Sequence, residues 1–506
     1  MKQPYKFTVA PRPALTADFF AGRRKEFFKR MSVDSVAIIN TNPMQTRSND
    51  TEYAYRPSSD MLYLSNFPEP EAVLVFVKTK ASSKNRFIMF VQPKDRSREI
   101  WTGKRFGPEG AIAQFGADEA HTIDELEAVL APLLAASEQL YYRFDRNEEV
   151  DKKVRALWSK SQQSLFNTDK LVHEMRLFKS PAEIAIMRHA GAISAAAHVE
   201  AMRLTRPGLM EYQVQASLEA VFRFNGASYP AYTSIVGGGS NATCLHYIEN
   251  ETELKGGDLL LIDAACEFKG FASDITRTFP VNGKFSKAQR EIYEIVLAAE
   301  KAGIAMARPG VTLADIHATA SNTLRAGLVK LGLLPKSHLT AEGEKAAVEA
   351  WKKKNEKSSN ASAKAVKKSK KADKAEKAPL TLFDFFMHGT SHWIGLDVHD
   401  VGTYGTRSQV GKKRPLEVGM AFTVEPGIYI MADEDRVPAK YRGIGIRIED
   451  DVVITAKGNE VLTAGVAKEV DEIEAIMAEG RAHNEEMDSY FSQRILAGAG
   501  KLSKKK

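Results

Sequence analysis

Apolar residues repeat along the first third of the chain with two periods, one typical of strands and the other of helices. Short runs rich in β-branched and aromatic residues predict strands at Ser35–Asn40, Ala72–Lys78 and Arg86–Gln92. A helical period covers Ala17–Met31, and Thr16 is suited to be its N-cap. Because such strands and helices alternate, this part of the chain predicts an α/β domain.

Two pairs of long helices are predicted after residue 172. The first pair begins with a capping box at Ser180–Glu183, runs to about Leu204 and resumes over Glu211–Asn225. The second pair is expected from Ser286–Gln289 to Arg308–Gly310 and over Leu313–Leu331, with Gly332 as the stop. Strands with two acidic residues follow each pair, so we infer a duplicated domain of two helix–helix–sheet halves. Helix caps are common, and their chance recurrence is the alternative.

Four carboxylates and one histidine in the second half of the chain lie in segments apolar enough to be buried. They are Asp263, Asp274, His392, Glu425 and Glu449. An unpaired charge in such surroundings would be costly, so the pattern indicates bound cations. Two divalent ions would balance four carboxylates. One imidazole with oxygen ligands and no thiolate favours Mn²⁺, with Co²⁺, Zn²⁺ and Fe²⁺ as alternatives. Two such ions, about 3.5–4 Å apart, are a recurrent device for hydrolysis.

The first two carboxylates lie on a predicted hairpin. Strands Leu259–Cys266 and Phe271–Phe279 are joined through Glu267–Gly270, in a register that places Asp263 directly opposite Asp274. Side chains opposed in this way have Cβ atoms about 4.5–5.5 Å apart, which suits one ion or two neighbouring ions. A hairpin with its acids facing water is the alternative, but the apolar neighbours of Asp263 leave little room for a solvated face.

The last two carboxylates lie at the ends of strands. Period-2 alternation over Ile444–Glu449 puts Arg447 and Glu449 on one face, where Arg447 can orient Glu449 or balance negative charge. Glu425 follows the apolar run Met420–Val424 and precedes a Pro-Gly turn signal, which places it at the mouth of a strand. Taken alone, a glutamate before Pro-Gly is more often an ordinary turn residue.

Ordered motifs closely resemble those of the Xaa-Pro aminopeptidases (aminopeptidase P) of the pita-bread metallopeptidase family. They are VHEMRLFKSPAEI, HYIEN, IDAACEFKGFASDITRTFPVNGKFS, HGTSHWIGLDVHDVG, TVEPGIYI and YRGIGIRIEDDVVIT. The likeness runs from about Thr46 to about Ile476. It implies an α/β amino-terminal domain and an α+β pita-bread catalytic domain, with a metal cluster on the pseudo-twofold axis of the duplication. The five metal ligands implied are Asp263, Asp274, His392, Glu425 and Glu449, with Asp274 and Glu449 bridging the ions.

The resemblance also implies the reaction and the residues that assist it. The activity expected is hydrolysis of the bond between an amino-terminal residue and a following proline, and no spacing in the sequence shows the proline preference itself. In this family the positions of His246, His388 and His399 contact substrate and stabilise the tetrahedral intermediate. Glu425 is expected to move the proton, and Arg447 completes the predicted catalytic set.

Three other functions fit parts of the pattern. Prolidase, which cleaves only Xaa-Pro dipeptides, has the same ligands and fold and is the closest alternative. Methionine aminopeptidase has the same core but does not need so large an amino-terminal domain. A non-enzymatic binding protein on the same scaffold would use a Lys-rich segment as its contact surface, and the complete ligand set argues against it. The match in TRSNDTEYAYRPSSDMLYLSNFPEPEAVL and REIWTGKRFG favours an aminopeptidase.

Positive charge is concentrated in one segment. Lys352–Lys377 holds eleven lysines and three acidic residues, whereas the net charge of the whole chain is only +7. This composition lacks the apolar residues needed to build a core, so 334–379 is predicted to be a mobile insertion. A solvated loop is a more common interpretation of such a run than a tether for nucleic acid or an anionic surface. Nucleic-acid binding is therefore not expected, except through this insertion.

The length of the chain and its motifs predict how it is divided into domains. The predicted parts are an amino-terminal domain over 1–172, a catalytic domain over 173–485 that contains the insertion, and a basic tail over 486–506. Two cysteines give no disulfide framework, the first residues lack the apolar core of a signal peptide, and no run approaches the roughly 18 apolar residues of a membrane span. These features predict a cytoplasmic protein without a membrane segment. Bacterial members of the family suggest a homotetramer or homodimer.

Overall fold

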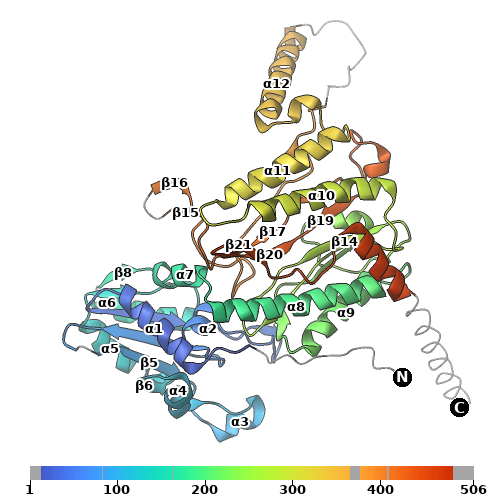
Figure 1. Cartoon of the computed structure of the whole chain (residues 1–506). Coiled ribbons are helices and arrows are strands. Elements are labelled where there is room, and N and C mark those ends of the chain that lie inside the picture. Colours follow the sequence, from blue (N-terminus) through green and yellow to red (C-terminus); the bar gives the residue numbers. More distant parts are fainter. Residues whose placement is uncertain (1–12, 83, 162, 365–376, 407–408, 482–506) are drawn as a thin grey trace, which may run out of the picture. The chain divides into compact units, whose positions relative to one another are not determined.

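The chain forms two compact units that divide between Glu183 and Ile184 (Figure 1). The computed structural model describes residues 13–82, 84–161, 163–364, 377–406 and 409–481. The limit predicted at residue 172 falls inside α7 (Asp169–Leu177), which belongs to the first unit. The domain limits stay a prediction, and the predicted tail over 486–506 lies outside the described residues.

A mixed six-stranded sheet forms the centre of the first unit. Its strand order is β6-β5-β4-β1-β7-β8, and β4 pairs antiparallel with both β1 and β5, whereas the other pairs are parallel. The strands are β1 (Ser35–Asn40), β4 (Val73–Lys78), β5 (Arg86–Val91), β6 (Glu119–Thr122), β7 (Gln139–Tyr141) and β8 (Ser164–Phe166). A separate small hairpin joins β2 (Thr46–Ser48) to β3 (Thr51–Glu52). The three strands predicted from the sequence are β1, β4 and β5, and all are confirmed.

Helices complete this α/β unit. They are α1 (Ala17–Arg30), α2 (Ser59–Ser65), α3 (Arg96–Thr102), α4 (Gly107–Phe115), α5 (Leu126–Ala135), α6 (Glu148–Ser161) and α7. The predicted cap of α1 is present, because Thr16 Oγ1 accepts a hydrogen bond from the Phe19 amide at 3.3 Å. Leu126, Leu130 and Leu134 form an i, i+4 stripe on α5 that packs in one core with the apolar residues of β1 and β4.

Two helix pairs, each followed by a three-stranded antiparallel sheet, build the second unit. The first half has α8 (Pro181–Leu204), α9 (Glu211–Phe224) and the sheet β10-β11-β14, formed by Ile235–Gly238, Leu259–Asp263 and Thr276–Pro280. The second half has α10 (Lys287–Met306), α11 (Leu313–Lys330) and the sheet β17-β20-β21, formed by Ala421–Val424, Asp450–Thr455 and Gly458–Val461. This repetition confirms the predicted duplication, and α10 and α11 lie side by side (Figure 1).

Capping boxes fix the starts of the long helices. The Ser180 amide donates to Glu183 Oε2 at 2.8 Å, and the Ser286 amide donates to Gln289 Oε1 at 2.8 Å. In each box the serine hydroxyl accepts a bond from the amide three residues on. Each box therefore satisfies amides that the first helical turn leaves unpaired. Both helices begin where the sequence predicts.

Short strands form two further small sheets in this unit. β18 (Gly427–Tyr429) pairs with β19 (Gly445–Arg447), and β12 (Cys266–Phe268) pairs with β13 (Phe271–Ala272) and with β9 (Tyr229–Pro230). They lie next to the ends of the longer strands in sequence, where the acidic residues occur.

The register predicted for the first acidic hairpin is wrong. In the structure Asp263 pairs with Thr276, and Asp274 lies in the segment between β13 and β14. The turn explains the difference, since Phe268 pairs with Phe271 and leaves Lys269 and Gly270 as its two central residues, with φ of +51° and +84°. Positive φ at both positions is the type I′ geometry that suits a two-residue hairpin. The prediction centred the turn one residue too early.

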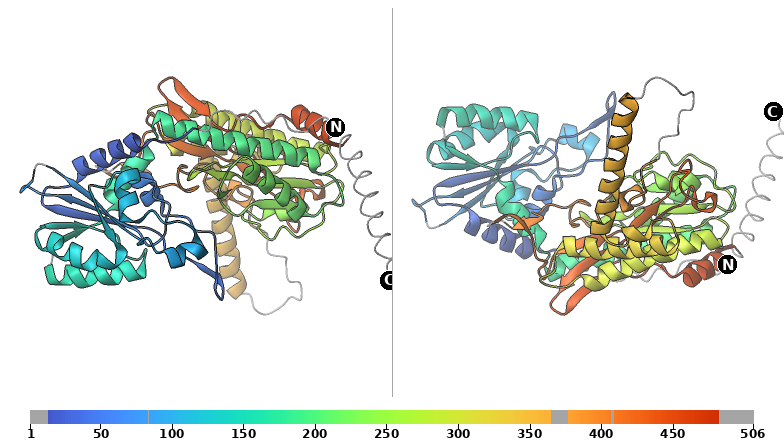
Figure 2. Two further views of the ribbon diagram at one scale, coloured as in Figure 1. Left: turned by 90° about the horizontal axis from the view of Figure 1, so that it is seen from below. Right: turned by 90° about the horizontal axis from the view of Figure 1, so that it is seen from above.

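The Lys-rich insertion differs from its prediction as well. A long helix, α12 (Ala341–Lys364), covers much of 334–379, after the short turn η3 (Lys336–His338), whereas residues 365–376 lie outside the described part of the chain. Composition unsuited to building a core does not prevent a helix, because Ala, Glu and Lys have high helix propensity. Figure 2 shows α12 in orange, projecting from the other helices of its unit. Mobility of the insertion stays a prediction.

Among the helices that the described ranges contain, none is long and apolar enough to cross a membrane. Both cysteines have free thiols, with Cys244 exposed and Cys266 buried.

Candidate metal centre and catalytic cavity

A cavity of about 650 Å³ in the second unit brings together every residue that the sequence predicts for the site. The predicted ligands on its wall are Asp263, Asp274, His392, Glu425 and Glu449. The predicted assisting residues on its wall are His246, His388, His399 and Arg447. These positions are separated by up to about two hundred residues in sequence, so the fold alone gathers them.

Strand ends of both sheets supply the four carboxylates. Asp263 is the last residue of β11, and Glu449 directly precedes β20, the central strands of the two sheets. Asp274 precedes β14, and Glu425 directly follows β17. Each half of the duplication therefore contributes two carboxylates to one cavity.

The imidazole of His392 is oriented by hydrogen bonds on its other side. Its Nδ1 is 3.1 Å from the Trp393 carbonyl, and its backbone amide and carbonyl both bond to Thr423 of β17. A carbonyl only accepts, so Nδ1 carries a proton, and in the neutral ring Nε2 presents a lone pair to the cavity. Nε2 lies 3.4 Å from Asp274 Oδ2 and 3.6 Å from Glu425 Oε1. This is the orientation of a metal-ligating histidine.

The pKa values of the clustered residues indicate that their negative charge needs a balancing positive charge. Burial, together with neighbouring carboxylates, raises the pKa of Glu425 to about 7 and the pKa values of Asp274 and Glu449 above their usual range. Burial opposes charge on His392, but contact with Asp274 and Glu425 outweighs it and raises that pKa to about 9. Divalent cations would reverse this repulsion. One donor atom each from Asp274, His392 and Glu449 already lies within 4.8 Å of the others, so these residues fit metal ions.

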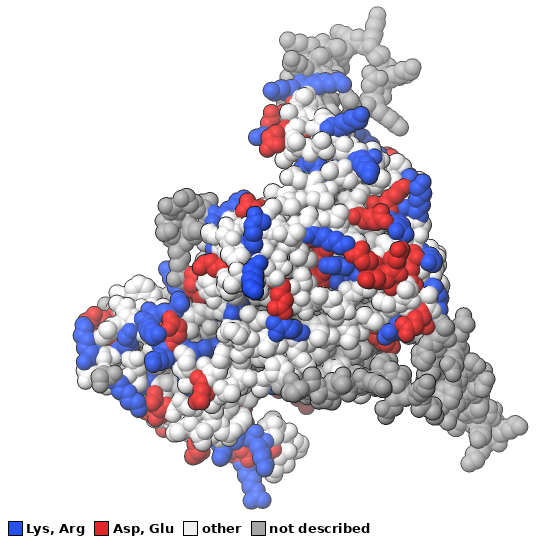
Figure 3. Space-filling model, in the orientation of Figure 1, with Lys and Arg blue, Asp and Glu red and all other residues white. Residues whose placement is uncertain are grey.

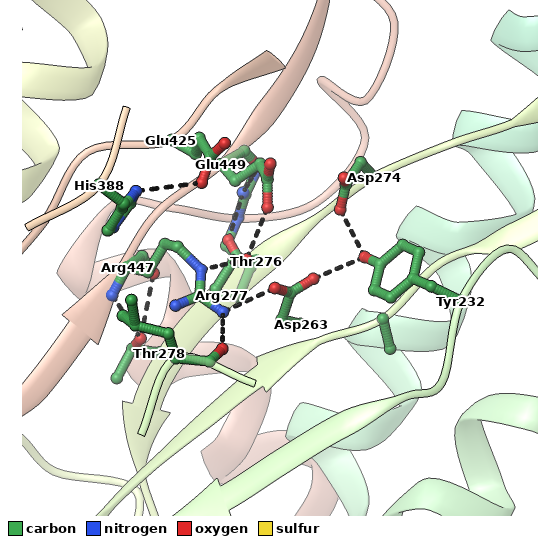
Figure 4. Close-up of polar contacts among 12 residues, drawn as sticks. Tyr232, Asp263, Asp274, Thr276, Arg277, Thr278, His388, Glu425, Arg447 and Glu449 are labelled. Carbon is green, nitrogen blue, oxygen red and sulfur yellow. Dashed lines mark hydrogen bonds and ion pairs between the residues drawn. The ribbon is translucent and has the colours of Figure 1, made fainter. Parts of the chain in front are cut away.

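Tyr232 and Thr276 bind the carboxylates, and neither residue was identified from the sequence. The Tyr232 hydroxyl lies 2.6 Å from Asp263 Oδ1 and 2.5 Å from Asp274 Oδ1, and so connects the two acids (Figure 4). The Thr276 hydroxyl donates to Glu449 Oε2 at 2.7 Å. Neither residue belongs to an apolar repeat, and only the fold brings each one to its acid.

Arg447 reaches a different carboxylate from the one the sequence suggested. Its Nη2 forms an ion pair with Asp263 Oδ2 at 2.6 Å, whereas it approaches Glu449 only through Thr276, whose hydroxyl lies 3.0 Å from Nε. Nη1 donates to the Tyr429 hydroxyl at 2.9 Å. Arg447 and Glu449 do face the same cavity, as the period-2 alternation predicts. Arg447 therefore balances charge and orients Asp263.

A second layer of buried charge fixes the backbone behind the cluster. Arg277, which is fully buried, donates to the Glu449 carbonyl at 2.6 Å and pairs with Asp450 at 2.8 Å. The Asp274 amide donates to Asp451 Oδ2 at 3.0 Å. These bonds join the strand that carries Glu449 to the segment that carries Asp274, so the two acids keep their spacing.

Three further histidines lie on the cavity wall. His388 Nε2 is 2.9 Å from the Tyr429 hydroxyl, and Nδ1 is 2.8 Å from the Gly389 carbonyl and 3.5 Å from Glu425 Oε2. Burial lowers the pKa of His388 to about 4 and also lowers the pKa of His399, whose ring centroid lies 4.3 Å from that of His392. In His388 the Nδ1 proton is donated to the Gly389 carbonyl, and Nε2 accepts from the Tyr429 hydroxyl. His246 is the third of these histidines.

Comparison with known proteins gives two family matches. Residues 185–456 match the model described as metallopeptidase family M24, and residues 20–141 match the amino-terminal domain of aminopeptidase P. Among curated proteins, the chain is 43% identical over 472 residues to the Xaa-Pro aminopeptidase of Escherichia coli strain K12, covering 91% of this chain and 98% of that protein. It is 33% identical over 464 residues to Xaa-Pro aminopeptidase 3 of Homo sapiens, covering 90% and 83%.

Solved structures give the same result. The aminopeptidase PepP of Pseudomonas aeruginosa has a TM-score of 0.82 and 41% identity, and the match covers 93% of this chain and 100% of that chain. Proline aminopeptidase P II from Yersinia pestis has a TM-score of 0.80 and 44% identity, with 92% and 100% covered.

Proposed function

Since the chain belongs to metallopeptidase family M24 and carries the amino-terminal domain of aminopeptidase P, we propose that it removes the amino-terminal residue from peptides whose second residue is proline. Its second unit has the pita-bread fold of this family. The observation that carries the proposal is the buried cluster of four carboxylates and one imidazole on the wall of an open cavity. The chain is a hydrolase of the metallopeptidase class.

We assign two metal ions to the cluster. The residues that would hold them are Asp263, Asp274, His392, Glu425 and Glu449. Oxygen donors with one imidazole and no thiolate favour Mn²⁺. Ions bound there supply acidification of a water molecule and polarisation of the scissile carbonyl.

Side chains of the cavity move the proton in the proposed mechanism. Glu425 accepts a proton from the attacking water and passes it to the proline nitrogen as the peptide bond breaks. Its two carboxylate oxygens face different histidines, since Oε1 lies near His392 and Oε2 near His388. The backbone of Glu425 is fixed because its amide donates to the Thr390 carbonyl at 2.8 Å. Glu425 is therefore held where it can act as a base and as a ligand.

Histidines of the cavity wall stabilise the oxyanion in the same proposal. His399 donates to the oxygen that becomes negative in the tetrahedral intermediate, together with His246 or His388. Both ring nitrogens of His388 already have partners, at Gly389 and Tyr429, so a substrate oxygen would have to displace the Gly389 carbonyl. This geometry favours His246 as the second donor and leaves His388 beside Glu425.

Removal of metal is expected to abolish activity. After dialysis against a chelator, turnover of an Xaa-Pro peptide should fall below about one hundredth of its starting value, because the proposed mechanism depends on the ions. Added Mn²⁺ should restore more activity than Co²⁺, Zn²⁺ or Fe²⁺. The measurement is the initial rate beside elemental analysis of the same sample. Full activity in a metal-free sample would refute the proposed mechanism.

Deletion of the Lys-rich segment 352–377 tests the role of the insertion. Joining its ends with a short Gly-Ser linker should leave turnover within a few-fold, because the described wall of the cavity contains no residue of 352–377. The same deletion should remove most binding to a polyanion such as heparin, because it removes the concentrated positive charge. Lys352, Lys353 and Lys354 are exposed, and Figure 3 shows basic side chains on the described part of α12. Loss of turnover in a folded deletion variant would make the segment part of the catalytic machinery.

The oligomeric state and the cellular location of the protein are proposed from different observations. Ile100 and Trp101 of α3 are 76% and 87% exposed, and adjacent large apolar side chains of this kind are typical of contact surfaces. We place a subunit contact of a homodimer or homotetramer there. The free cysteines suit a reducing compartment, and we place the protein in the cytoplasm.

A further inference from the structure

One carboxylate ties the insertion helix α12 to the catalytic unit. Glu344 Oε2, in the first turn of α12, accepts from Arg325 Nη1 at 2.6 Å and from the Leu382 amide at 2.7 Å. Arg325 belongs to α11, and Leu382 begins the short turn η4 (Leu382–Asp384). A single oxygen atom of α12 therefore contacts both α11 and η4.

These three elements meet in a buried environment. Arg325 is 5% exposed and Leu382 is 7% exposed. The Arg325 guanidinium also donates to the carbonyl of His338, a residue of η3 that is 1% exposed. A buried guanidinium without its carboxylate would be costly, so the pair holds Glu344 in place.

The turn that Glu344 fixes leads directly to the cavity. The Leu382 carbonyl accepts from the amides of Phe385 and Phe386 at 3.0 and 2.8 Å. The Phe385 carbonyl accepts from the amide of Tyr429 at 2.9 Å, and the Tyr429 hydroxyl bonds to His388 on the cavity wall. The position of Leu382 therefore sets the backbone on which Tyr429 depends.

A second path from the same turn ends at Glu425. The ring of Phe386 packs against His388 at a centroid distance of 4.8 Å and against His317 at 5.7 Å. His317 Nδ1 is 2.8 Å from the Thr390 hydroxyl, and the Thr390 carbonyl accepts from the Glu425 amide. The segment that follows Leu382 therefore contacts His388 directly, through Phe386, and contacts Glu425 indirectly, through His317 and Thr390.

We propose that Glu344 is a positioning residue: through Leu382 it fixes the segment Phe385–His388 and so holds His388 and Tyr429 in place beside Glu425. This inference rests on the proposed function, which gives His388 and Glu425 their roles. The insertion then has two parts, an anchor at the start of α12 that acts on the catalytic cavity and a Lys-rich remainder that does not.

The first test compares three variants of the full chain. Glu344→Ala removes the acceptor for both donors, Glu344→Gln keeps an acceptor for the Leu382 amide, and Glu349→Gln is the matched control because Glu349 is an exposed residue of the same helix. On Ala-Pro-Ala we expect kcat to fall about three- to tenfold in Glu344→Ala, less in Glu344→Gln, and not in the control, with KM within about twofold in all three. Equal kcat values in Glu344→Ala and Glu349→Gln would overturn the proposal.

A double-mutant cycle separates positioning from general support of the fold. If Glu344 acts through His388, the Glu344→Gln substitution should lower kcat by less in a His388→Asn background than in the wild-type background. The same fold-loss in both backgrounds would mean that Glu344 only stabilises the fold, and would overturn the proposal.

Hydrogen exchange tests the contact without relying on activity. Peptides that cover Leu382–Met387 should exchange their amides faster in Glu344→Ala than in wild type or Glu349→Gln, because the Leu382 amide has lost its acceptor. Unchanged exchange would overturn the proposal. If wild type fails to cleave any Xaa-Pro peptide, the proposed function fails, and the exchange result still decides whether Glu344 fixes this segment.

Discussion

Substitution of Asp274 by asparagine is expected to lower kcat/KM on Xaa-Pro peptides about a thousandfold or more. Asp274 is 5% exposed, and its oxygens face His392 Nε2 and the Tyr232 hydroxyl. Asparagine keeps the shape but removes the charge that helps to hold divalent cations. The cluster should bind metal more weakly, and the activation of water should be lost together with the electrostatic stabilisation of the transition state.

The measurement for Asp274→Asn is kcat/KM beside metal content, at equal protein concentration. Asp471→Asn is the control, because the Asp471 side chain is 87% exposed and does not line the cavity. The control should keep the activity and metal content of wild type. Activity within tenfold of wild type in Asp274→Asn would contradict the assignment of Asp274 as a ligand.

Substitution of Glu425 by glutamine is expected to lower kcat by about 10²- to 10⁴-fold, the range attributed to a general base. Glutamine has an oxygen that can still contact a cation but cannot accept and return a proton. The loss should therefore appear mainly in kcat, with KM changed much less and with metal retained better than in Asp274→Asn.

Comparison of Asp274→Asn with Glu425→Gln separates the role of Glu425 as a metal ligand from its role as a base. Glu417→Gln is the matched control, because Glu417 lies near the same strand in sequence and its side chain is 57% exposed. It should behave as wild type. A Glu425→Gln enzyme with normal kcat would assign proton transfer to another residue of the cavity.

Local features of the fold were predictable because their causes are local. Thr16, the Ser180–Glu183 box and the Ser286–Gln289 box each satisfy helix amides with side chains a few residues away, so the sequence contains the whole interaction. The alternation that places Arg447 and Glu449 on one face is equally local. These signals located the helix pairs, the strand ends and the ligand candidates.

Non-local partners could not be read from the sequence. The hairpin register depends on which two residues form the turn. Lysine rarely adopts a positive φ, so the sequence does not indicate that Lys269 is one of them. Tyr232 meets its two acids across 31 and 42 residues of sequence. Arg277 meets Asp450 across 173 residues. For Tyr232 and Arg277 the partner is set by the tertiary fold, which no short pattern encodes.

The insertion shows the limit of a compositional argument. Low apolar content predicts that a segment builds no core of its own, and that inference does not exclude a helix anchored at one end. The anchor is Glu344, whose partners Arg325 and Leu382 lie outside the helix. A single glutamate in an Ala-, Glu- and Lys-rich run carries no signal that distinguishes it from its exposed neighbours.

The most direct test of the central claim is a comparison of kcat/KM for Ala-Pro, Ala-Pro-Ala, Ala-Pro-Ala-Ala and Ala-Ala-Ala with the Mn²⁺-loaded protein. An aminopeptidase leaves the side beyond the proline open, whereas a dipeptidase must close it. We predict cleavage after the first residue of both longer proline peptides, at least as efficient as cleavage of Ala-Pro, with Ala-Ala-Ala cut far more slowly. Cleavage confined to Ala-Pro would make the enzyme a prolidase, and equal cleavage of Ala-Ala-Ala would contradict its specificity for proline.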